Sequence, residues 1–411
     1  MQKIYLNKAY YYLTAVVLTL LMLSLPTSKA GMNIFSALLA LGGFGYAIFN
    51  VKTLTKLEKF AFLFCIATYS IGGIASYALH ASELDFAYYM QKNSFWLLIP
   101  VFILILKHEQ LKNLACIAFI LAATIAGIES LYDAYLANFD VYARSTGFLG
   151  HSRHANSMLL SIGLSLIYLN KKETGTAIKS LLWGCIIIAI LSLLVSGSRG
   201  AWLGGGAMLL YVIIRFHKAL IKPGIILAIL VAVIASISFP DKVERYVERA
   251  KSIVHLELSG LARLTMWRGG LEYMGHQVSD SPITLIAGSG MYSAKEKYLS
   301  YVDALQPEER EHLLTDGGVF GGSDFHNSIL DVFVKSGVLY ATLFFGAWAF
   351  VISKAMKGTN QDIFACRYVI AYFVGLFVIY QFYTIAQDYA TYATAFAVSL
   401  LLSEMMREKE A

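Results

Sequence analysis

Residues 223–239 read PGIILAILVAVIASISF, an apolar run without a charged side chain. A helix of about 17–25 such residues spans the hydrocarbon core of a bilayer. A hydrophilic stretch of 86 residues, 240–325, follows at once and ends at His326 and Asn327, where another apolar run begins. The sequence therefore predicts a membrane protein with one large region outside the membrane.

The composition of the whole chain supports this prediction. Hydrophobic residues make up 57% of the sequence and charged residues 15%, and the mean hydropathy is +0.60. Soluble domains carry about 25% charged residues. The net charge of +6 comes mostly from short basic loops, so it does not indicate a nucleic-acid partner. The four cysteines lie far apart in or beside apolar runs, which predicts packing roles: Cys65, Cys116, Cys185 and Cys366.

We expect an all-α polytopic membrane protein with about twelve transmembrane helices and one large, mostly helical outer loop. The weakest separation between two helices is Gly197-Ser198-Arg199, because the flanking apolar run is nearly continuous. The chain then divides into residues 1–239 with helices one to nine, the loop 240–325, and residues 326–411 with helices ten to twelve. The predicted spans lie near 10–26, 32–50, 58–78, 92–106, 113–135, 155–170, 178–196, 199–214, 223–239, 327–351, 364–386 and 388–405.

The distribution of Lys and Arg predicts the orientation, because short basic loops stay on the cytoplasmic side. Both termini are then cytoplasmic, and the loop 240–325 faces outward. Lys3 and Lys8 before the first apolar run also fit a signal peptide, but this topology favours an uncleaved first helix. The inner cations are Lys3, Lys8, Lys52, Lys56, Lys59, Lys107, Lys112, Lys171, Lys172, Lys179, Arg215, Lys218, Lys222, Lys354, Lys357, Arg367, Arg407 and Lys409, whereas the short outer loops hold Lys29, Lys92, Arg144, Arg153 and Arg199.

Arg199 is a candidate for anion binding. Ser198 is a suitable N-cap for the helix that follows, which places Arg199 in the first turn beside free backbone N–H groups. An arginine at membrane depth is costly and is therefore a functional candidate. The alternative is an arginine that reaches to the interface or pairs with a carboxylate.

The outer loop supplies further arginines. Lys242–Ile253 and Ala262–His276 have the pattern of amphipathic helices. On the second helix Arg263 shares a face with Trp267, whereas Arg268 points elsewhere. A second arginine would complete a clamp on a pyrophosphate, since bidentate pairing of Arg with phosphate is strong. Both arginines also fit an ordinary surface helix.

His326 lies where the polar loop meets the tenth predicted helix. If it opens that helix, Gly337 follows after about three turns, and Tyr340 falls on nearly the same face. The ordinary pKa of histidine, near 6.5, suits a base that takes a proton from a sugar hydroxyl. The alternative is an interfacial histidine with a structural hydrogen bond. Asp316 and Asp324, on either side of a glycine-rich turn, either orient His326 or are plain loop residues.

The segment from Arg144 to Asn156 holds two more histidines, His151 and His154, and a second arginine, Arg153. These side chains at a helix mouth are candidates for lining a cavity. Zinc ligation by the two histidines is disfavoured because no carboxylate or cysteine is near. The sequence also lacks a Walker A motif, a GxSxG elbow and an Asp-x-Asp in a βαβ context, which argues against ATP-driven transport and soluble nucleotide-sugar transferases.

Together these residues resemble the O-antigen ligase and polymerase superfamily. Its ligases carry a His-[Asn/Ser/Gln]-x9-Gly-x-x-[Gly/Thr/Tyr] signature at the end of a large periplasmic loop. His326-Asn327, Gly337 and Tyr340 match it completely. The resemblance spans roughly residues 140–345, and the remaining helices match only in number.

Three further segments support the resemblance. Arg199 to Leu203 matches the family's Arg-x3-Leu, and Arg263 matches the arginine of its Ala-Arg-Leu-x-x-Trp segment. Gly288-Ser289-Gly290 resembles the Gly-x-Gly that follows. His154-Ala155-Asn156 departs from the usual Asn-Pro-Asn, so no role is carried over to it.

The resemblance implies an inverting, metal-independent glycosyltransferase of the bacterial inner membrane that needs no cofactor and no nucleotide. It implies transfer of O-antigen from undecaprenyl pyrophosphate to a sugar hydroxyl of lipid A-core at the periplasmic face. His326 is then the base, and Arg199 and Arg263 hold the pyrophosphate; the expected substrate-binding residues are His151, Arg153, Arg268, Asn327 and Tyr340. The alternatives are an O-antigen polymerase, a protein O-oligosaccharyltransferase and a polysaccharide transporter.

Overall fold

The computed structural model describes residues 8–80, 82–254, 258–315, 318–319, 325–357 and 364–410. Within these ranges the regular structure is helical, except for one antiparallel pair of two-residue strands, β1 (Leu314–Thr315) and β2 (Gly318–Val319). The all-α prediction is therefore confirmed for this part of the chain. Asp316 and Asp324 lie outside the described residues.

A helix overlaps each of the twelve predicted apolar spans, and helices also form most of the described residues within 240–325. In the first half of the chain they are α1 (Lys8–Ser24), α2 (Lys29–Phe49), α3 (Lys56–His80), α4 (Glu83–Asn93), α5 (Phe95–Leu106), α6 (Glu109–Leu136), α7 (His151–Leu169), α8 (Thr176–Val195) and α9 (Arg199–Phe216), with the short 3-10 helix η1 (Gly147–Leu149) before α7. After η2 (Lys218–Leu220) come α10 (Ile221–Ser238), α11 (Pro240–Val254), α12 (Leu258–Asp280), α13 (Pro282–Ala287), α14 (Ala294–Ala304), α15 (Pro307–Glu311), α16 (Ser328–Ala355), α17 (Phe364–Tyr380) and α18 (Thr391–Glu410).

Length and hydropathy identify a multi-pass membrane protein. Six helical segments of the described chain are long and apolar enough to cross a bilayer, namely 29–49, 56–77, 83–106, 109–136, 176–195 and 328–355. The apolar helices 8–24 and 365–380 are shorter. The count of twelve spans stays a prediction.

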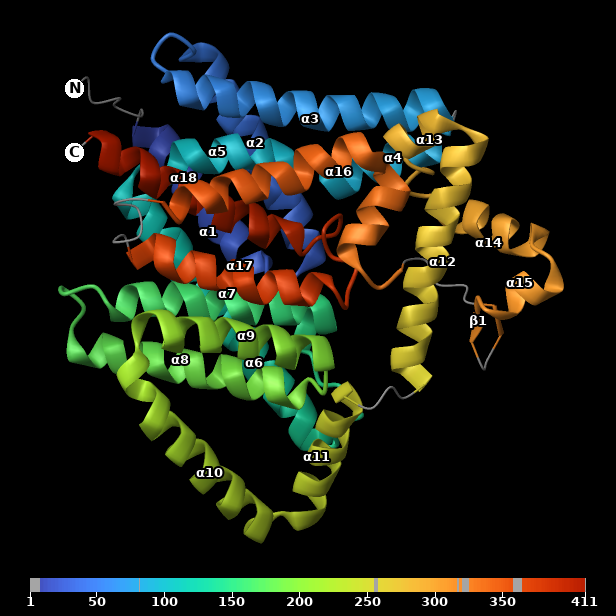
Figure 1. Ribbon diagram of the computed structural model, residues 1–411. Coiled ribbons are helices and arrows are strands. Elements are labelled where there is room, and N and C mark those ends of the chain that lie inside the picture. Colours follow the sequence, from blue (N-terminus) through green and yellow to red (C-terminus); the bar gives the residue numbers. More distant parts are fainter. Residues whose placement is uncertain are drawn as a thin grey trace.

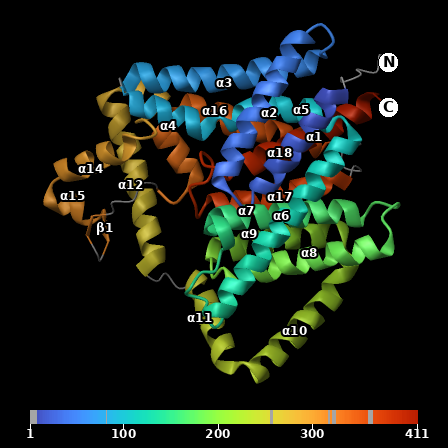
Figure 2. The ribbon, with the colours of Figure 1, turned by 180° about the vertical axis from the view of Figure 1, so that it is seen from behind.

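Most of the long helices run side by side, and α12 crosses one end of this bundle (Figure 1). The view from behind shows the same arrangement, with α14 on the far side of α12 from the bundle (Figure 2). α1 begins and α18 ends at the opposite end (Figure 1). The segment that the sequence predicted as the outer loop therefore contributes its helix α12 to the end of the bundle away from both termini.

Small residues bring α9 and α17 into close contact. A Cβ atom on Gly204 would lie 2.9 Å from the carbonyl oxygen of Gly375, and one on Gly375 would lie 2.7 Å from the oxygen of Gly204. Glycine at both positions lets the two backbones approach, which is how helices commonly pack within membranes. This contact fixes the beginning of α9, where Arg199 lies, against the end of α17.

The expected stripe of His326, Gly337 and Tyr340 on one continuous helix is wrong. α16 begins only at Ser328, and it is broken at Gly337, whose φ of 75° and ψ of 172° are not helical. The break frees backbone carbonyls for the turn after α13. Ser289 N donates to Val334 O at 2.8 Å and Gly290 N to Lys335 O at 3.0 Å. The Gly-x-Gly turn of the segment 240–325 is thus bound to the break in α16.

The predicted spans 364–386 and 388–405 placed residues 381–390 almost wholly in helices, and this is also wrong. α17 ends at Tyr380 and α18 begins at Thr391, so a non-helical segment of ten residues separates them. Ser328 holds this segment to the start of α16, because its hydroxyl donates to Tyr383 O at 2.5 Å and accepts from Ile385 N at 2.9 Å. The segment 381–390 therefore lies beside His326.

Ion pairs are also present at the beginning of α6 and the end of α18. Lys112, which is buried, contacts Glu404, and it lies 2.7 Å from Glu109. Arg407 also pairs with Glu109. These charges lie at helix ends and do not form a series along the middle of the bundle.

Candidate active site

An arginine-lined cavity of about 400 Å³ lies at the end of the bundle that α12 crosses. Its walls come from segments far apart in sequence, including the starts of α7 and α9, the helices α11 and α12, and the segment 381–390. The four arginines that line it are Arg144, Arg199, Arg249 and Arg263. His326 and His151 line it as well, so the cavity contains all three residues that the sequence proposed for catalysis.

Arg199 is positioned as the sequence predicts. Ser198 caps α9 by accepting a hydrogen bond from Ala201 N at 3.3 Å, and Arg199 is the first residue of the helix. The guanidinium is buried, and its Nη1 donates to Ser252 O at 2.6 Å and to Ser252 Oγ at 3.2 Å. The hydroxyls of Ser198 and Tyr383 also contact each other. Arg199 is thus bound to α11, beside the N-terminal N–H groups of α9.

Arg249 and Arg263 reach the cavity from the two amphipathic helices α11 and α12. The Nε atom of Arg249 donates to Gly197 O at 3.1 Å, and its guanidinium lies 5.5 Å from the centre of the Tyr142 ring. Arg263 lies 5.9 Å from the centre of the Phe382 ring. Its Nε atom is buried and has no hydrogen-bond partner among the described residues. Arg263 therefore brings a donor that a ligand in the cavity can use.

The surroundings of Arg263 change its acidity. Burial lowers the pKa of its guanidinium from the ordinary value of 12.5, and the positive charges of Arg144 and Arg249 lower it further. The guanidinium nevertheless remains protonated at neutral pH, since arginine does not lose its proton in proteins. Clustered positive charges in a partly buried cavity are most readily stabilised by an anion.

His326 is held on both sides by residues with clear structural roles. Phe325 packs edge-on against Tyr298, with ring centres 5.3 Å apart. Asn327 caps α16, because its side-chain oxygen accepts from Ile329 N at 3.0 Å and Leu330 N at 3.1 Å. His326 itself has a φ of 48°, in the left-handed region that residues other than glycine seldom adopt. Strained backbone of this kind is concentrated at functional sites.

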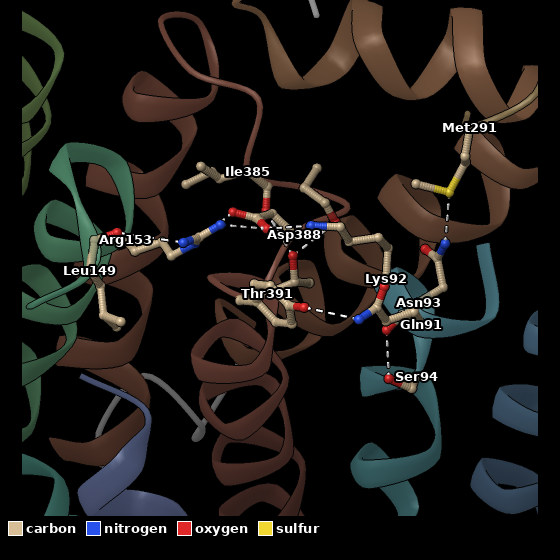
Figure 3. Close-up of polar contacts among 12 residues, drawn as sticks. Gln91, Lys92, Asn93, Ser94, Leu149, Arg153, Met291, Ile385, Asp388 and Thr391 are labelled. Atoms are coloured by element: carbon tan, nitrogen blue, oxygen red, sulfur yellow. Dashed lines mark hydrogen bonds and ion pairs between the residues drawn. The ribbon is translucent and has the colours of Figure 1, made fainter. Parts of the chain in front are cut away.

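An ion-pair cluster joins α7, α4 and the segment 381–390 (Figure 3). Arg153 binds the Asp388 carboxylate through two contacts, Nε to Oδ2 at 2.7 Å and Nη2 to Oδ1 at 2.9 Å. Lys92 contacts Oδ1 at 3.0 Å. Burial alone would raise the pKa of Asp388, but the Arg153 hydrogen bond and the Lys92 charge together lower it below its ordinary value. Asp388 is therefore a charged carboxylate in the lining of the arginine-lined cavity, held in place by Arg153 and Lys92.

The other expected substrate-binding residues lie in different surroundings. Arg268 is exposed and pairs with Glu272 at 2.8 Å, away from the cavity lining. Tyr340 is buried among helices, where it accepts from Trp96 Nε1 at 2.9 Å and donates to Asn93. Asn327 uses its side-chain oxygen for the α16 cap, and its Nδ2 donates to Gln381 at 3.3 Å. Arg153 acts on the cavity through Asp388, whereas His151 lines it directly.

The histidines at the start of α7 have separate environments. His151 lines the cavity, and its buried Nδ1 atom has no hydrogen-bond partner among the described residues. His154 is buried beneath it and contacts the hydroxyl of Ser192 on α8. In the described part of the chain, no group of three or more His, Cys, Asp or Glu side chains has a geometry that fits a metal ion.

Sequence reasoning missed Arg249, Tyr383, Thr384 and Asp388 of the cavity wall. The position of Arg249 in the sequence is that of a solvent-exposed residue on an amphipathic helix. Nothing in that pattern indicated that its side chain lines a cavity. Tyr383 and Asp388 were hidden in the apolar pattern that predicted continuous helices. The signal that was available is Asp388 itself, since a carboxylate in a predicted span is costly and marks a functional candidate.

The charge balance of the cavity determines which ligands it can hold. Four arginines and two histidines line it, and Asp388 is the one carboxylate among its described lining residues. That carboxylate is already bound by Arg153 and Lys92. The cavity therefore suits a ligand with several negative charges, and His326 lines the same cavity.

Comparison with known proteins agrees with this geometry. No curated protein shows significant similarity to the chain. Residues 184–345 match the family model described as O-antigen ligase, and this segment includes Arg199, Arg249, Arg263 and His326 but not the segment 381–390. Over residues 184–345 this membrane protein is therefore similar to the O-antigen ligase family.

Proposed function

We propose that the protein is an O-antigen ligase. It transfers O-antigen polysaccharide from undecaprenyl pyrophosphate to a sugar hydroxyl of lipid A-core. The observation that carries this proposal is the shared cavity of His326 and four arginines. His326 and three of these arginines, Arg199, Arg249 and Arg263, lie within the segment that matches the ligase family. A pyrophosphate is an anion that such a cluster binds strongly, because each guanidinium can donate two parallel hydrogen bonds to it.

In the proposed reaction a sugar hydroxyl of the acceptor attacks the anomeric carbon of the donor glycan. A new bond forms between the acceptor oxygen and that carbon, and the bond from the carbon to the pyrophosphate oxygen breaks. His326 takes the proton of the attacking hydroxyl. The pyrophosphate leaves with the electron pair of the broken bond. Because the hydroxyl attacks from the opposite face, the configuration at the anomeric carbon is inverted.

The arginines are the electrostatic part of this mechanism. Negative charge grows on the pyrophosphate oxygen as the bond breaks, and donors that are already in place stabilise it without further reorganisation. Arg199 is held by Ser252, and Arg249 by Gly197, so both are positioned before substrate binds. Arg263, with its unpartnered Nε, is proposed to bind the pyrophosphate directly.

We further propose that the cavity faces the periplasm and that both termini are cytoplasmic. The distribution of Lys and Arg supports this orientation, as does the position of α12 at the end of the bundle away from the beginning of α1 and the end of α18 (Figure 1). The proposed ligase uses no nucleotide, no metal and no cofactor, because the polyprenyl pyrophosphate is itself an activated leaving group.

A reconstituted transfer assay tests this function. The purified protein is mixed with a glycan on undecaprenyl pyrophosphate and with lipid A-core, and products are separated on a gel. A ligase attaches the glycan to lipid A-core, whereas an O-antigen polymerase, which the same family model also covers, extends the glycan on its carrier. Carrier-linked extension without transfer to lipid A-core would contradict the ligase assignment.

A further inference from the structure

A second cavity of about 630 Å³ adjoins the arginine-lined one, and we call it the adjoining cavity. The two share Thr384 and Asp388 as lining residues. Its other walls come from α4, from the residues before and along α14, and from the first part of α16. None of the four arginines of the arginine-lined cavity lines it. The adjoining cavity thus shares two lining residues with the arginine-lined cavity but lacks its arginines.

The lining of the adjoining cavity holds three lysines and four carboxylates, and most of these charges are paired. Lys335 pairs with Asp331 at 2.8 Å, and Lys92 pairs with Asp388 at 3.0 Å. Asp303 pairs at 2.6 Å with Arg310, which lies outside the lining. Paired charges of this kind do not favour a polyanion, but their remaining donor and acceptor positions can serve the hydroxyl groups of a neutral ligand.

Aromatic side chains supply an apolar surface for such a ligand. Tyr292 lines the adjoining cavity, is 55% exposed and lies edge-on to Tyr88, with ring centres 6.1 Å apart. The backbone beneath it is fixed, because the buried carboxylate of Asp85 accepts from Tyr292 N at 2.6 Å and Ser293 N at 3.0 Å. The ring of Tyr292 is therefore presented on a rigid turn, and it can be removed without loss of these backbone contacts.

We infer that the adjoining cavity binds a sugar chain, with Tyr292 packing against a sugar ring. A ligand there lies next to Asp388 and Thr384, and through that shared wall it reaches the cavity that contains His326. The volume is within the range of about 300–1,000 Å³ that is usual for small-molecule sites. This inference rests on the proposed function for its link to glycan transfer. The sugar chain comes either from the acceptor or from the donor.

Direct binding distinguishes these two sources. Core oligosaccharide released from lipopolysaccharide by mild acid is one probe, and the repeat-unit oligosaccharide released from its carrier is the other. Saturation-transfer NMR measures the binding of each to the purified full chain in detergent. We expect one probe to bind, and we expect Tyr292→Ala to weaken its binding roughly tenfold, while Tyr292→Phe stays within about twofold of wild type.

Tyr132→Ala is the matched control, because Tyr132 is also 55% exposed but lies on α6 and lines neither cavity. It should leave binding unchanged. A loss confined to core oligosaccharide identifies the acceptor, and a loss confined to the repeat unit identifies the donor. If wild type binds neither probe, or if Tyr292→Ala binds both as wild type does, the sugar site is contradicted.

Glycan transfer is measured on the same preparations, so that a failure of the sugar site can be distinguished from a failure of the ligase function. Wild type that binds a probe in a Tyr292-dependent way but transfers no glycan contradicts the ligase function and supports the sugar site. Wild type that transfers glycan, with KM for donor and acceptor unchanged in Tyr292→Ala, contradicts the sugar site and leaves the ligase function supported.

Discussion

The backbone nitrogen of Ser289 donates a hydrogen bond of 2.8 Å to the carbonyl oxygen of Val334, three residues before the glycine at which α16 breaks. Two separate sequence motifs, the Gly-x-Gly turn and the glycine of the histidine signature, are therefore parts of one contact. The contact fixes the first part of α16, and with it the position of His326 just before that helix.

The first prediction concerns Gly337. A Cβ atom there would lie 2.2 Å from Ile286 O, and the φ of 75° is unfavourable for alanine. We expect Gly337→Ala to destabilise the protein by about 3 kcal/mol, through backbone strain and steric overlap. Thermal unfolding in detergent measures the effect. Gly346→Ala on the same helix is the control, because a Cβ there meets nothing within 4 Å; equal melting temperatures for the two variants would refute the account of the break.

The second prediction concerns His326. His326→Ala removes the proposed base, and we expect glycan transfer to fall by about 10²–10⁴-fold, the usual contribution of a general base. His312→Ala is the control, since His312 is exposed and does not line either cavity. The reconstituted transfer assay measures both. Full activity in His326→Ala would show that another group takes the proton.

The third prediction concerns the geometry of the arginines. Lysine keeps the positive charge but lacks the planar fork of the guanidinium. We therefore expect Arg199→Lys and Arg263→Lys to lower kcat/KM for the lipid-linked donor by roughly 10- to 100-fold. Arg268→Lys, on the same helix as Arg263 but exposed and paired with Glu272, should transfer at the wild-type rate. If the three variants behave alike, bidentate binding of the pyrophosphate is the wrong explanation.

The fourth prediction concerns Asp388. Replacing it by asparagine leaves Arg153 and Lys92 without their shared carboxylate, and we expect a loss of about 3 kcal/mol at pH 7. Because the pKa of Asp388 is lowered in the folded protein, its stabilising effect is complete above the ordinary value of 3.8 and is lost as the pH falls below it. The difference in melting temperature between wild type and Asp388→Asn should therefore shrink below about pH 3.8. A difference that stays constant down to pH 3 would contradict the ion-pair account.

The sequence predicted the helices well, because a span of apolar residues has few other stable structures in a bilayer. Even the weak separation at Gly197-Ser198-Arg199 is confirmed, since α8 ends at Val195 and α9 begins at Arg199. The apolar pattern predicted neither the break at Gly337 nor the non-helical segment 381–390. The break at Gly337 lies against the turn at Gly288, and local periodicity carries no information about such a tertiary contact.

Only part of the candidate site could be predicted, because some of its residues reach the cavity through tertiary contacts. Arg199, Arg263 and His326 stood out because each interrupts an apolar or amphipathic pattern within a recognisable motif. Arg249 looked like any solvated helix residue, and only the packing of α11 against the start of α9 turns it towards the cavity. Asp388 was concealed because its neighbours Ile385, Ala386 and Ala390 continue the apolar pattern of a span.

In the proposed reaction the protein attaches O-antigen to lipid A-core, and His326 is the base in the arginine-lined cavity. The most direct test is a lipopolysaccharide gel of a strain that lacks this gene, complemented with wild type, His326→Ala or His312→Ala. We expect wild type and His312→Ala to restore the full ladder, and His326→Ala to leave bare core while long polymer accumulates on the lipid carrier. Core that carries a single repeat unit in the deletion strain, or a full ladder with His326→Ala, would contradict the account.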